Sequence, residues 1–216
     1  MNGEARSGGG VLICFAVKEE AQPFLQTAAS QRAKILITGI GGNNAERGLR
    51  ESFETGLPEI VLSCGFAGGL NPQIANGEVV FSTDLNFPLQ THLRASGAKQ
   101  GAFYCAKRIV TSTMEKAALR SQTGADAVEM ESEVIRRICT ERKLPSATVR
   151  VISDAANEDL PMDFNQFMTA EYKLSLCRLI SVMLLKPWKI PALIRFEKKT
   201  KAAAKNLSRV LESLPI

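Results

Sequence analysis

The sequence has little of what many active sites and membrane anchors are built from. It contains one histidine, His92, and five scattered cysteines with no Cys-x-x-Cys pair, so no metal site is expected. An odd number of isolated cysteines is typical of reduced, buried thiols in an intracellular protein. No apolar run approaches the roughly 20 residues that span a bilayer, and residues 1–10 lack the hydrophobic segment of a secretory signal. We therefore expect a cytoplasmic protein.

Net charge is also nearly absent from most of the chain. Residues 186–209 hold eight lysines and arginines and one acid, which gives this segment a charge of +7. The other residues hold 19 basic and 21 acidic side chains, so the overall charge of +5 comes from the tail. The basic character therefore says little about the partners of the rest of the protein.

Short apolar runs without polar alternation recur along the chain and predict strands that are buried on both faces. These runs are 11–17, 34–42, 58–70, 77–84, 107–113, 126–130 and 146–155. Helical patterns lie between them at 44–56 and 132–144, and the chain has a helical pattern from Phe164 to its end. The alternation predicts an α/β fold with three αβα layers and a mostly parallel, mixed central sheet.

The expected organisation is one catalytic domain with two appendages. Residues 1–10 are a disordered lead-in, residues 11–185 form the domain, and residues 186–216 form a basic, amphipathic helical extension.

Two glycine loops end predicted strands, at 38–45 and 64–72. Glycines at the carboxyl end of a strand let backbone N–H groups approach a ligand closely, although each loop could equally be a tight turn. A dinucleotide site is weakly indicated, because the strand after the first loop carries no acid at its end. Neither loop has the Gly-Lys-Ser/Thr ending of a P-loop.

Residues 126–133 read DAVEMESE and concentrate four carboxylates in an otherwise basic chain. If a strand ends here, Glu129 and Glu131 share one face and a helix begins near Ser132. Glu131 then lies at the ligand edge of the sheet, where a carboxylate can accept hydrogen bonds from vicinal hydroxyls. The alternative is a carboxylate that caps the helix N-terminus. Glu133 is expected to be solvated, near arginines three and four residues on.

Two further acids end predicted strands. Asp154 follows a strongly β-forming run, and burial there would raise its pKa and suit it to donate a proton. The alternative is an Asp that begins a turn. Glu20 follows the first strand and could orient a nucleophile or a hydroxyl, or it could be an acid in the first turn of a helix.

Four segments of the chain resemble the superfamily of purine nucleoside phosphorylases and methylthioadenosine/S-adenosylhomocysteine nucleosidases. They are FAVKEEAQPF (15–24), ITGIGGNNA (37–45), SCGFAGGLNPQIANGEVVFSTD (63–84) and AVEMESEVIRRICTERKLPSATVRVISDAANE (127–158). The resemblance covers roughly residues 11–170. It implies cleavage of the N-glycosidic bond of a purine nucleoside without a cofactor, with phosphate as a possible co-substrate, in a homodimer.

The resemblance also implies catalytic roles. Asp154 matches the acid that protonates N7 of the departing purine, and Ser153 would orient it. Glu20 matches the acid near the attacking water. Met114 lies about where the family places an apolar residue against the base.

The sugar is expected to contact a second group of residues. Glu131 matches the carboxylate that holds the ribose hydroxyls, and Met130 matches the methionine packed against the sugar. Glu129 belongs to the same motif and is a further substrate-binding candidate. Ala67 and Gly68 match the loop that lines the ribose and the base.

The chain departs from the nucleosidase pattern at the site of the nucleophile. Phe66 stands where the nucleosidases have a serine, and Gly42 replaces the lysine of the first glycine loop. The Gly-Asp-Pro-x-Arg phosphate loop of many phosphorylases is absent as well, and Arg47 is only a candidate phosphate ligand. Water and phosphate therefore both remain possible nucleophiles.

The tail resembles that of hopanoid-associated phosphorylases, which are linked to removing adenine from a 5′-lipid-substituted adenosine. The apolar stripe and the lysines of residues 186–214 would suit a helix that rests on an anionic membrane surface. The alternative is a helix packed on its own domain. A nucleic-acid partner is not favoured, because few aromatics interleave the charges. A 5′-substituted adenosine is thus the expected substrate, with a hydrolytic nucleosidase or a non-catalytic nucleoside- or membrane-binding member as alternatives.

Overall fold

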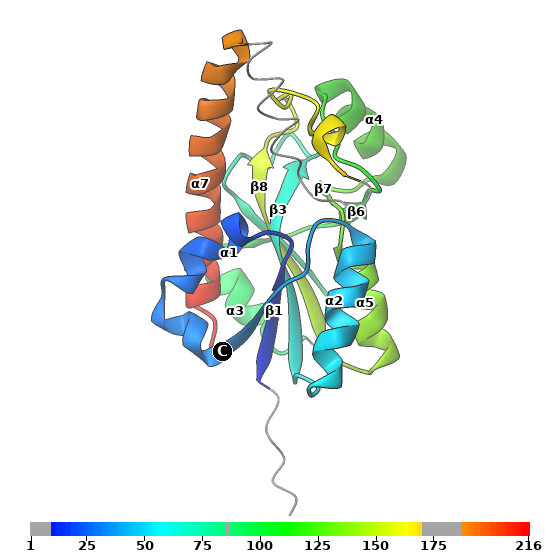
Figure 1. The fold of residues 1–216 in the computed structure, drawn as a ribbon, viewed down its shortest axis with the longest axis vertical. Helices are drawn as coiled ribbons and strands as arrows, with labels where there is room; N and C mark the ends of the chain where they lie inside the picture. Colours follow the sequence, from blue (N-terminus) through cyan, green and yellow to red (C-terminus); the bar gives the residue numbers. More distant parts are fainter. Residues whose placement is uncertain (1–9, 85–86, 170–186) are drawn as a thin grey trace, which may run out of the picture.

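The computed structural model describes residues 10–84, 87–169 and 187–216. Its centre is a mixed sheet with the strand order β2-β1-β3-β8-β4-β5 (Figure 1). The strands are β1 (Val11–Phe15), β2 (Ala33–Ile37), β3 (Ile60–Gly69), β4 (Val79–Thr83), β5 (Lys99–Gln100), β6 (Phe103–Cys105), β7 (Ala127–Glu129) and β8 (Ser146–Asp154). β2, β1, β3 and β8 are parallel, whereas β4 runs antiparallel to β8 and β7 antiparallel to the end of β3. The predicted mostly parallel, mixed sheet is confirmed.

Helices cover both faces of this sheet. They are α1 (Lys18–Leu25), α2 (Gly42–Glu54), α3 (Gln90–Ala95), α4 (Thr113–Thr123), α5 (Ser132–Glu141) and α7 (Ile190–Glu212). In Figure 1, α1 and α7 lie on one side of the sheet, and α2 and α5 lie on the other. The three expected layers are therefore present.

Strand alternation explains the two layers of core. Along β1, Ile13 and Phe15 pack with buried residues of α1 and α7, whereas Leu12 and Cys14 pack with those of α2 and α5. Each face of the strand is apolar because each faces a helix layer, which is why the strands read as unbroken apolar runs.

The structure corrects one predicted strand and several boundaries. Residues 107–113 form no strand; they lead into α4, which Ser112 caps by accepting a hydrogen bond from the backbone of Glu115. The apolar pattern of that run reflects Val110, which is buried in a side cluster and not in a ladder. The glycines of the first loop lie outside β2, and α2 begins at Gly42. Part of the helical pattern predicted after Phe164, residues 170–186, lies outside the described residues.

The second half of α7 is part of the domain core. Ala203, Leu207 and Leu211 are each at most 1% exposed and pack with residues of β1, β3 and β8. The start of α7 and the turn before it differ, since Ile194 is 47% exposed and Trp188, which precedes the helix, is 69% exposed. The boundary at residue 186 stays a prediction. Among the described residues, no helix combines the length and the apolar composition needed to cross a membrane.

Candidate active site

A cavity of about 270 Å³ lies where the carboxyl ends of the parallel strands meet one edge of the sheet. Ligands of open α/β sheets bind at this edge. Eight of the nine site residues predicted from the sequence line it: Glu20, Ala67, Gly68, Glu129, Met130, Glu131, Ser153 and Asp154. The fold thus gathers segments that lie more than 130 residues apart in the chain, although the role of each residue stays a prediction.

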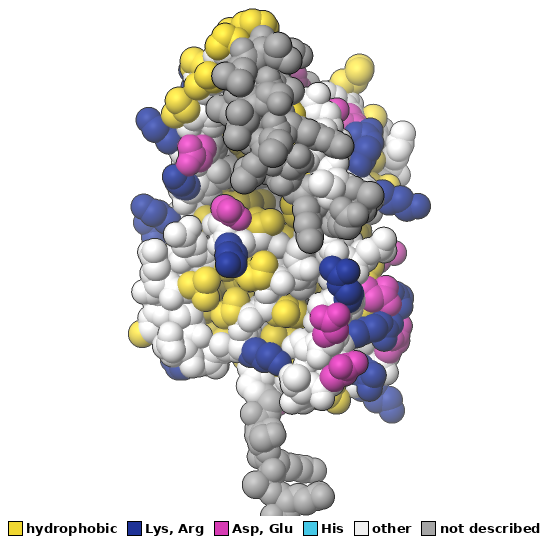
Figure 2. All heavy atoms as spheres, in the orientation of Figure 1, with side chains coloured by type: hydrophobic (Ala, Val, Ile, Leu, Met, Phe, Trp, Pro, Cys, Tyr) yellow, Lys and Arg dark blue, Asp and Glu magenta, His cyan; other side chains and the backbone are white. Residues whose placement is uncertain are grey.

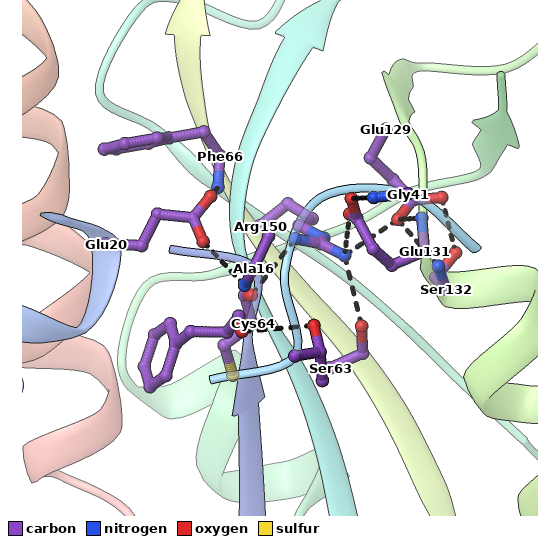
Figure 3. A network of polar contacts seen from close by, with 12 residues as sticks. Ala16, Glu20, Gly41, Ser63, Cys64, Phe66, Glu129, Glu131, Ser132 and Arg150 are labelled. Atoms are coloured by element: carbon purple, nitrogen blue, oxygen red, sulfur yellow. Dashed lines mark hydrogen bonds and ion pairs between the residues drawn. The ribbon is translucent and has the colours of Figure 1, made fainter. Parts of the chain in front are cut away.

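A buried arginine organises the carboxylates beside this cavity. Arg150 lies in the middle of β8 and is 1% exposed. Its guanidinium group lies 2.8 Å from Oε2 of Glu129 and 3.2 Å from Oε2 of Glu131, and it also donates to Ser63 and to the carbonyl of Cys64 (Figure 3). A buried charge is tolerated when it is paired in this way, so the carboxylates and the arginine depend on one another.

Glu20 connects the first strand to the third. Its Oε2 accepts a hydrogen bond from the backbone N–H of Ala16 at 2.9 Å, and its Oε1 accepts one from Phe66 at 2.8 Å (Figure 3). Burial raises the pKa of Glu20, and Arg150 together with the backbone donors opposes that rise. Because one oxygen reaches across to β3, Glu20 does more than begin a helix: it fixes the position of the second glycine loop.

Glu131 and Glu129 divide two functions within one motif. Glu129 accepts from the backbone N–H groups of Glu131 and Ser132 and from the Ser132 hydroxyl, so it caps α5. Glu131 accepts from the N–H of Gly41 at 2.8 Å and has Arg150 on its other oxygen. Burial raises the pKa of Glu131 to about 7, although Arg150 opposes the rise. The capping role considered for Glu131 thus belongs to Glu129.

We expect Glu131 to make stability depend on pH. In the fold its carboxyl keeps a proton between its ordinary pKa of 4.5 and about 7, so the folded state binds more protons there than the unfolded chain. Stability should therefore fall as pH rises through this window. Thermal unfolding between about pH 5 and pH 8 should show a smaller fall for Glu131→Gln than for the wild type.

The exposed neighbour Glu133 provides the control, because Glu133→Gln should keep the pH dependence of the wild type. A pH dependence that is the same in Glu131→Gln and in the wild type would contradict the assignment.

A bulge at the end of β8 sets the positions of Ser153 and Asp154. The register with β3 changes from Ala67 opposite Ile152 to Gly68 opposite Asp154, which leaves Ser153 as the extra residue. The Ser153 hydroxyl consequently reaches its own neighbour and donates to Oδ1 of Asp154 at 2.6 Å. Asp154 is 5% exposed, and burial raises its pKa although Lys116 opposes the rise.

Comparison with known proteins places this chain in a family. The family model of the phosphorylase superfamily matches residues 16–97 and 89–184. The chain belongs to this superfamily. The 5′-methylthioadenosine/S-adenosylhomocysteine nucleosidase of Glaesserella parasuis is 26% identical in an alignment 168 residues long that covers 62% of this chain and 73% of that protein. The superfamily inferred from the sequence is confirmed, and with it the interpretation of the chain as an enzyme.

Solved structures of other proteins share the fold of this chain. A futalosine hydrolase of Helicobacter pylori superposes with a TM-score of 0.68 and 16% identity, covering 97% of this chain and 98% of that one. A Neisseria meningitidis 5′-methylthioadenosine/S-adenosylhomocysteine nucleosidase, in complex with methylthio-immucillin-A, also has a TM-score of 0.68, with 18% identity over 94% of this chain and 97% of that one. The expected fold class is therefore confirmed.

The structure corrects the placement of Met114. This side chain is 81% exposed and does not line the cavity of this phosphorylase-superfamily protein. Met114 and Lys116 are two positions apart on α4, so they point to opposite sides of the helix, and Lys116 occupies the buried side. The apolar wall comes from elsewhere: Ile109, Val110, Leu160, Phe164 and Phe196.

Sequence reasoning missed two charged residues of this superfamily member. Arg150 and Lys116 are both buried, and each contacts predicted site residues. A signal for Arg150 exists, since it interrupts the apolar run TVRVIS, where an unpaired charge would be costly. Lys116 gives no such signal, because it lies on a helix with other polar residues.

Gly65 leaves the space that the Arg150 network needs. A Cβ built there would lie 2.5 Å from Nη1 of Arg150 and 2.6 Å from Oε1 of Glu20, at a φ of +148°. We expect Gly65→Ala to lower the free energy of unfolding by about 1–3 kcal/mol through overpacking, and to abolish activity. Gly97→Ala is the matched control: it has a φ of +87° with open space around the added Cβ, so it carries backbone strain alone. If denaturant unfolding shows that the two variants lose the same free energy of unfolding, the close approach of Arg150 and Glu20 to Gly65 is refuted.

Proposed function

We propose that this chain cleaves the N-glycosidic bond of a purine nucleoside, an adenosine substituted at its 5′ carbon, and releases adenine. One observation carries the proposal: the buried carboxylates of Asp154, Glu131 and Glu20 line, together with that of Glu129, a single and otherwise largely apolar cavity. The activity named for the relative from Glaesserella parasuis supports the same reaction.

The proposed roles follow the chemistry of the three acids. Asp154 protonates N7 of the purine, so that the base leaves neutral. Glu131 accepts hydrogen bonds from the ribose hydroxyls. As the bond to the base breaks, positive charge develops on the ribosyl group, and the carboxylates of Glu131 and Glu20 stabilise it. Glu20 also holds the nucleophile on the face opposite the base.

Water is the nucleophile that this cavity favours. A phosphate dianion would need cationic donors, and the guanidinium of Arg150 is already committed to Glu129 and Glu131. Among the described residues that line the cavity, Arg108 is the one lysine or arginine, and it contacts Glu115. We therefore propose hydrolysis first and phosphorolysis, with Arg108 as phosphate ligand, second.

The test is adenine release from adenosine and from 5′-methylthioadenosine, with and without phosphate, with chromatographic identification of the sugar. Hydrolysis gives the free sugar at the same rate in both conditions. Release that requires phosphate and yields the sugar 1-phosphate would establish the second candidate. If no purine nucleoside releases its base, the chain is a non-catalytic binding member of its superfamily.

A large apolar 5′ substituent would suit the wall of the cavity. Phe196 of α7 and Phe164 line it, and their ring centroids are 5.8 Å apart. Ile194 at the same end of α7 and Trp188 in the turn before it are exposed, and hydrophobic side chains gather at this end of the molecule in Figure 2. The tail carries a charge of +7, which attracts anionic lipid. We propose that this end of α7 rests on a membrane from which a lipid-substituted nucleoside enters.

Vesicle sedimentation tests the membrane contact. The double variant Trp188→Ala/Ile194→Ala should bind phosphatidylglycerol vesicles about 10-fold more weakly than the wild type, because it loses buried apolar area. The double variant Leu25→Ala/Leu57→Ala removes side chains of 45% and 46% exposure elsewhere and should bind as the wild type does. Equal binding by all three proteins would refute the contact. The expected homodimer is a separate prediction that light scattering can check.

A further inference from the structure

A buried lysine that the proposed mechanism does not use lies against the proposed acid. The side chain of Lys116 is 0% exposed, and its Nζ lies 2.6 Å from Oδ2 of Asp154. The same Nζ donates to the carbonyl oxygens of Ala155 at 2.8 Å and of Glu158 at 2.7 Å. We propose that Lys116 supplies, through Asp154, the proton that the leaving purine takes up. This inference rests on the proposed function.

The location of Lys116 is costly for the fold, which sets it apart from the surface lysines. It lies in the first turns of α4, near the positive end of the helix dipole, where a cation is unfavourable. It is also removed from water, which costs free energy unless the charge is paired. The carbonyls of Ala155 and Glu158 accept two of its three hydrogens, and the charge is further balanced by the ion pair with Asp154.

The pairing gives the two oxygens of Asp154 different partners. Oδ1 accepts from the Ser153 hydroxyl. Oδ2 is buried and has no hydrogen-bond partner within residues 10–84, 87–169 and 187–216, so the ion pair with Lys116 is its one described polar contact. An ammonium group at this distance favours the carboxylate form of Asp154, whereas burial raises its pKa and favours the carboxyl form. Whenever the two groups are present as an ion pair, Asp154 has no proton of its own, and Lys116 is the neighbouring group that has one.

The step balances in protons and electrons. An N–H bond of Lys116 breaks as an O–H bond forms at Asp154, which leaves a neutral amine and a neutral carboxyl. The carboxyl proton then moves to N7 while the electron pair of the glycosidic bond passes into the purine. The attacking water loses a proton as it joins the ribose. That proton, exchanged through solvent in the cavity, restores the ammonium group of Lys116.

Other charges around the pair are themselves paired or exposed. Glu158 follows β8 and has an ion pair with Lys199 of α7 at 2.5 Å. Asp159 is exposed and accepts from the backbone of Thr113, and Arg195 of α7 lines the hollow outside Asp154. Glu158 tends to raise the pKa of Asp154, and Lys116 lowers it. Lys116 is thus the charged side chain that directly contacts the acid.

The test compares the pH profiles of the wild type and Lys116→Met. Without Lys116, Asp154 must carry its own proton, so activity falls as pH rises through the pKa of that carboxyl. In the wild type Lys116 is a second source of that proton, so the proposal predicts a smaller fall of activity with pH. We expect kcat/KM of Lys116→Met for adenine release to be near that of the wild type at about pH 5, and at least about 10-fold below it at about pH 9.

Two further comparisons separate proton supply from folding. Lys116→Arg keeps the charge but cannot release a proton, so it should be less active than Lys116→Met at about pH 5. The purely structural role predicts the reverse order. A 4-nitrophenyl riboside, whose leaving group needs no proton, should show a much smaller loss in Lys116→Met than a purine nucleoside does. If Lys116→Met does not fold, Lys116→Gln takes its place in both assays.

The exposed lysine of the pair Lys201–Glu197 serves as the control, and Lys201→Met should follow the wild-type profile. The proposed proton supply would be overturned if the pH profile of kcat/KM for Lys116→Met ran parallel to that of the wild type. It would also be overturned if Lys116→Met lost as much activity on the 4-nitrophenyl riboside as on the purine nucleoside. An inert wild type would instead refute the proposed function, so the two failures are distinguishable.

Discussion

Asp154→Asn is expected to lower kcat for adenine release by about 100- to 10,000-fold, which is the usual contribution of a general acid. The change replaces a carboxyl that can pass on a proton by an amide that cannot. Asparagine has the same shape, and its amide oxygen can still accept from Ser153 or face Lys116. KM should change much less than kcat, because the lost interaction belongs to the transition state.

The control variant is taken from the acidic stretch 126–133, which also contains Glu131. Glu133→Gln removes an exposed carboxylate of the same motif and should leave kcat unchanged. Calorimetry should show both variants folded. If Asp154→Asn retains the activity of the wild type, Asp154 is not the acid, whichever nucleophile the enzyme uses.

The largest expected loss of stability follows from Arg150→Met. Removing one partner of a buried ion network leaves the others uncompensated, and we expect the free energy of unfolding to fall by about 3–5 kcal/mol. Glu129 and Glu131 lose an ion pair, and Glu20 loses a nearby positive charge. Arg150 holds down the pKa values of Glu20 and Glu131, so both carboxyls should protonate more readily in the variant. The loss should therefore be smaller at about pH 5 than at about pH 8.

A surface arginine provides the comparison. Arg50 is paired with Glu46 and Glu141 and remains well exposed. Arg50→Met should change denaturant unfolding little, because exposed pairs contribute little. If Arg150→Met and Arg50→Met unfold at the same denaturant concentration, the carboxylate cluster does not depend on Arg150.

Particular residues show which parts of the site could be predicted from the sequence and which could not. Glu131 and Asp154 could be found because each ends an apolar run, and the carboxyl ends of parallel strands meet at one edge. Met114 was placed against the base by the resemblance alone; on a helix, the direction of its side chain depends on which side of α4 packs inwards. The exposed half of α7 and its buried half have similar sequence patterns, and packing alone distinguishes them.

The sequence by itself determined the layered fold, the edge at which ligands bind, and the acids that arrive there, because strand-length apolar runs and the residues that end them are local features. The tertiary structure decided which partners those acids have. Arg150 lies beside Glu129 and Glu131 through the pairing of β8 with β3 and of β3 with β7, and Lys116 reaches Asp154 through the packing of α4. A carboxylate's protonation depends on burial and on charges a few ångströms away, and those charges come from parts of the chain that local sequence does not connect.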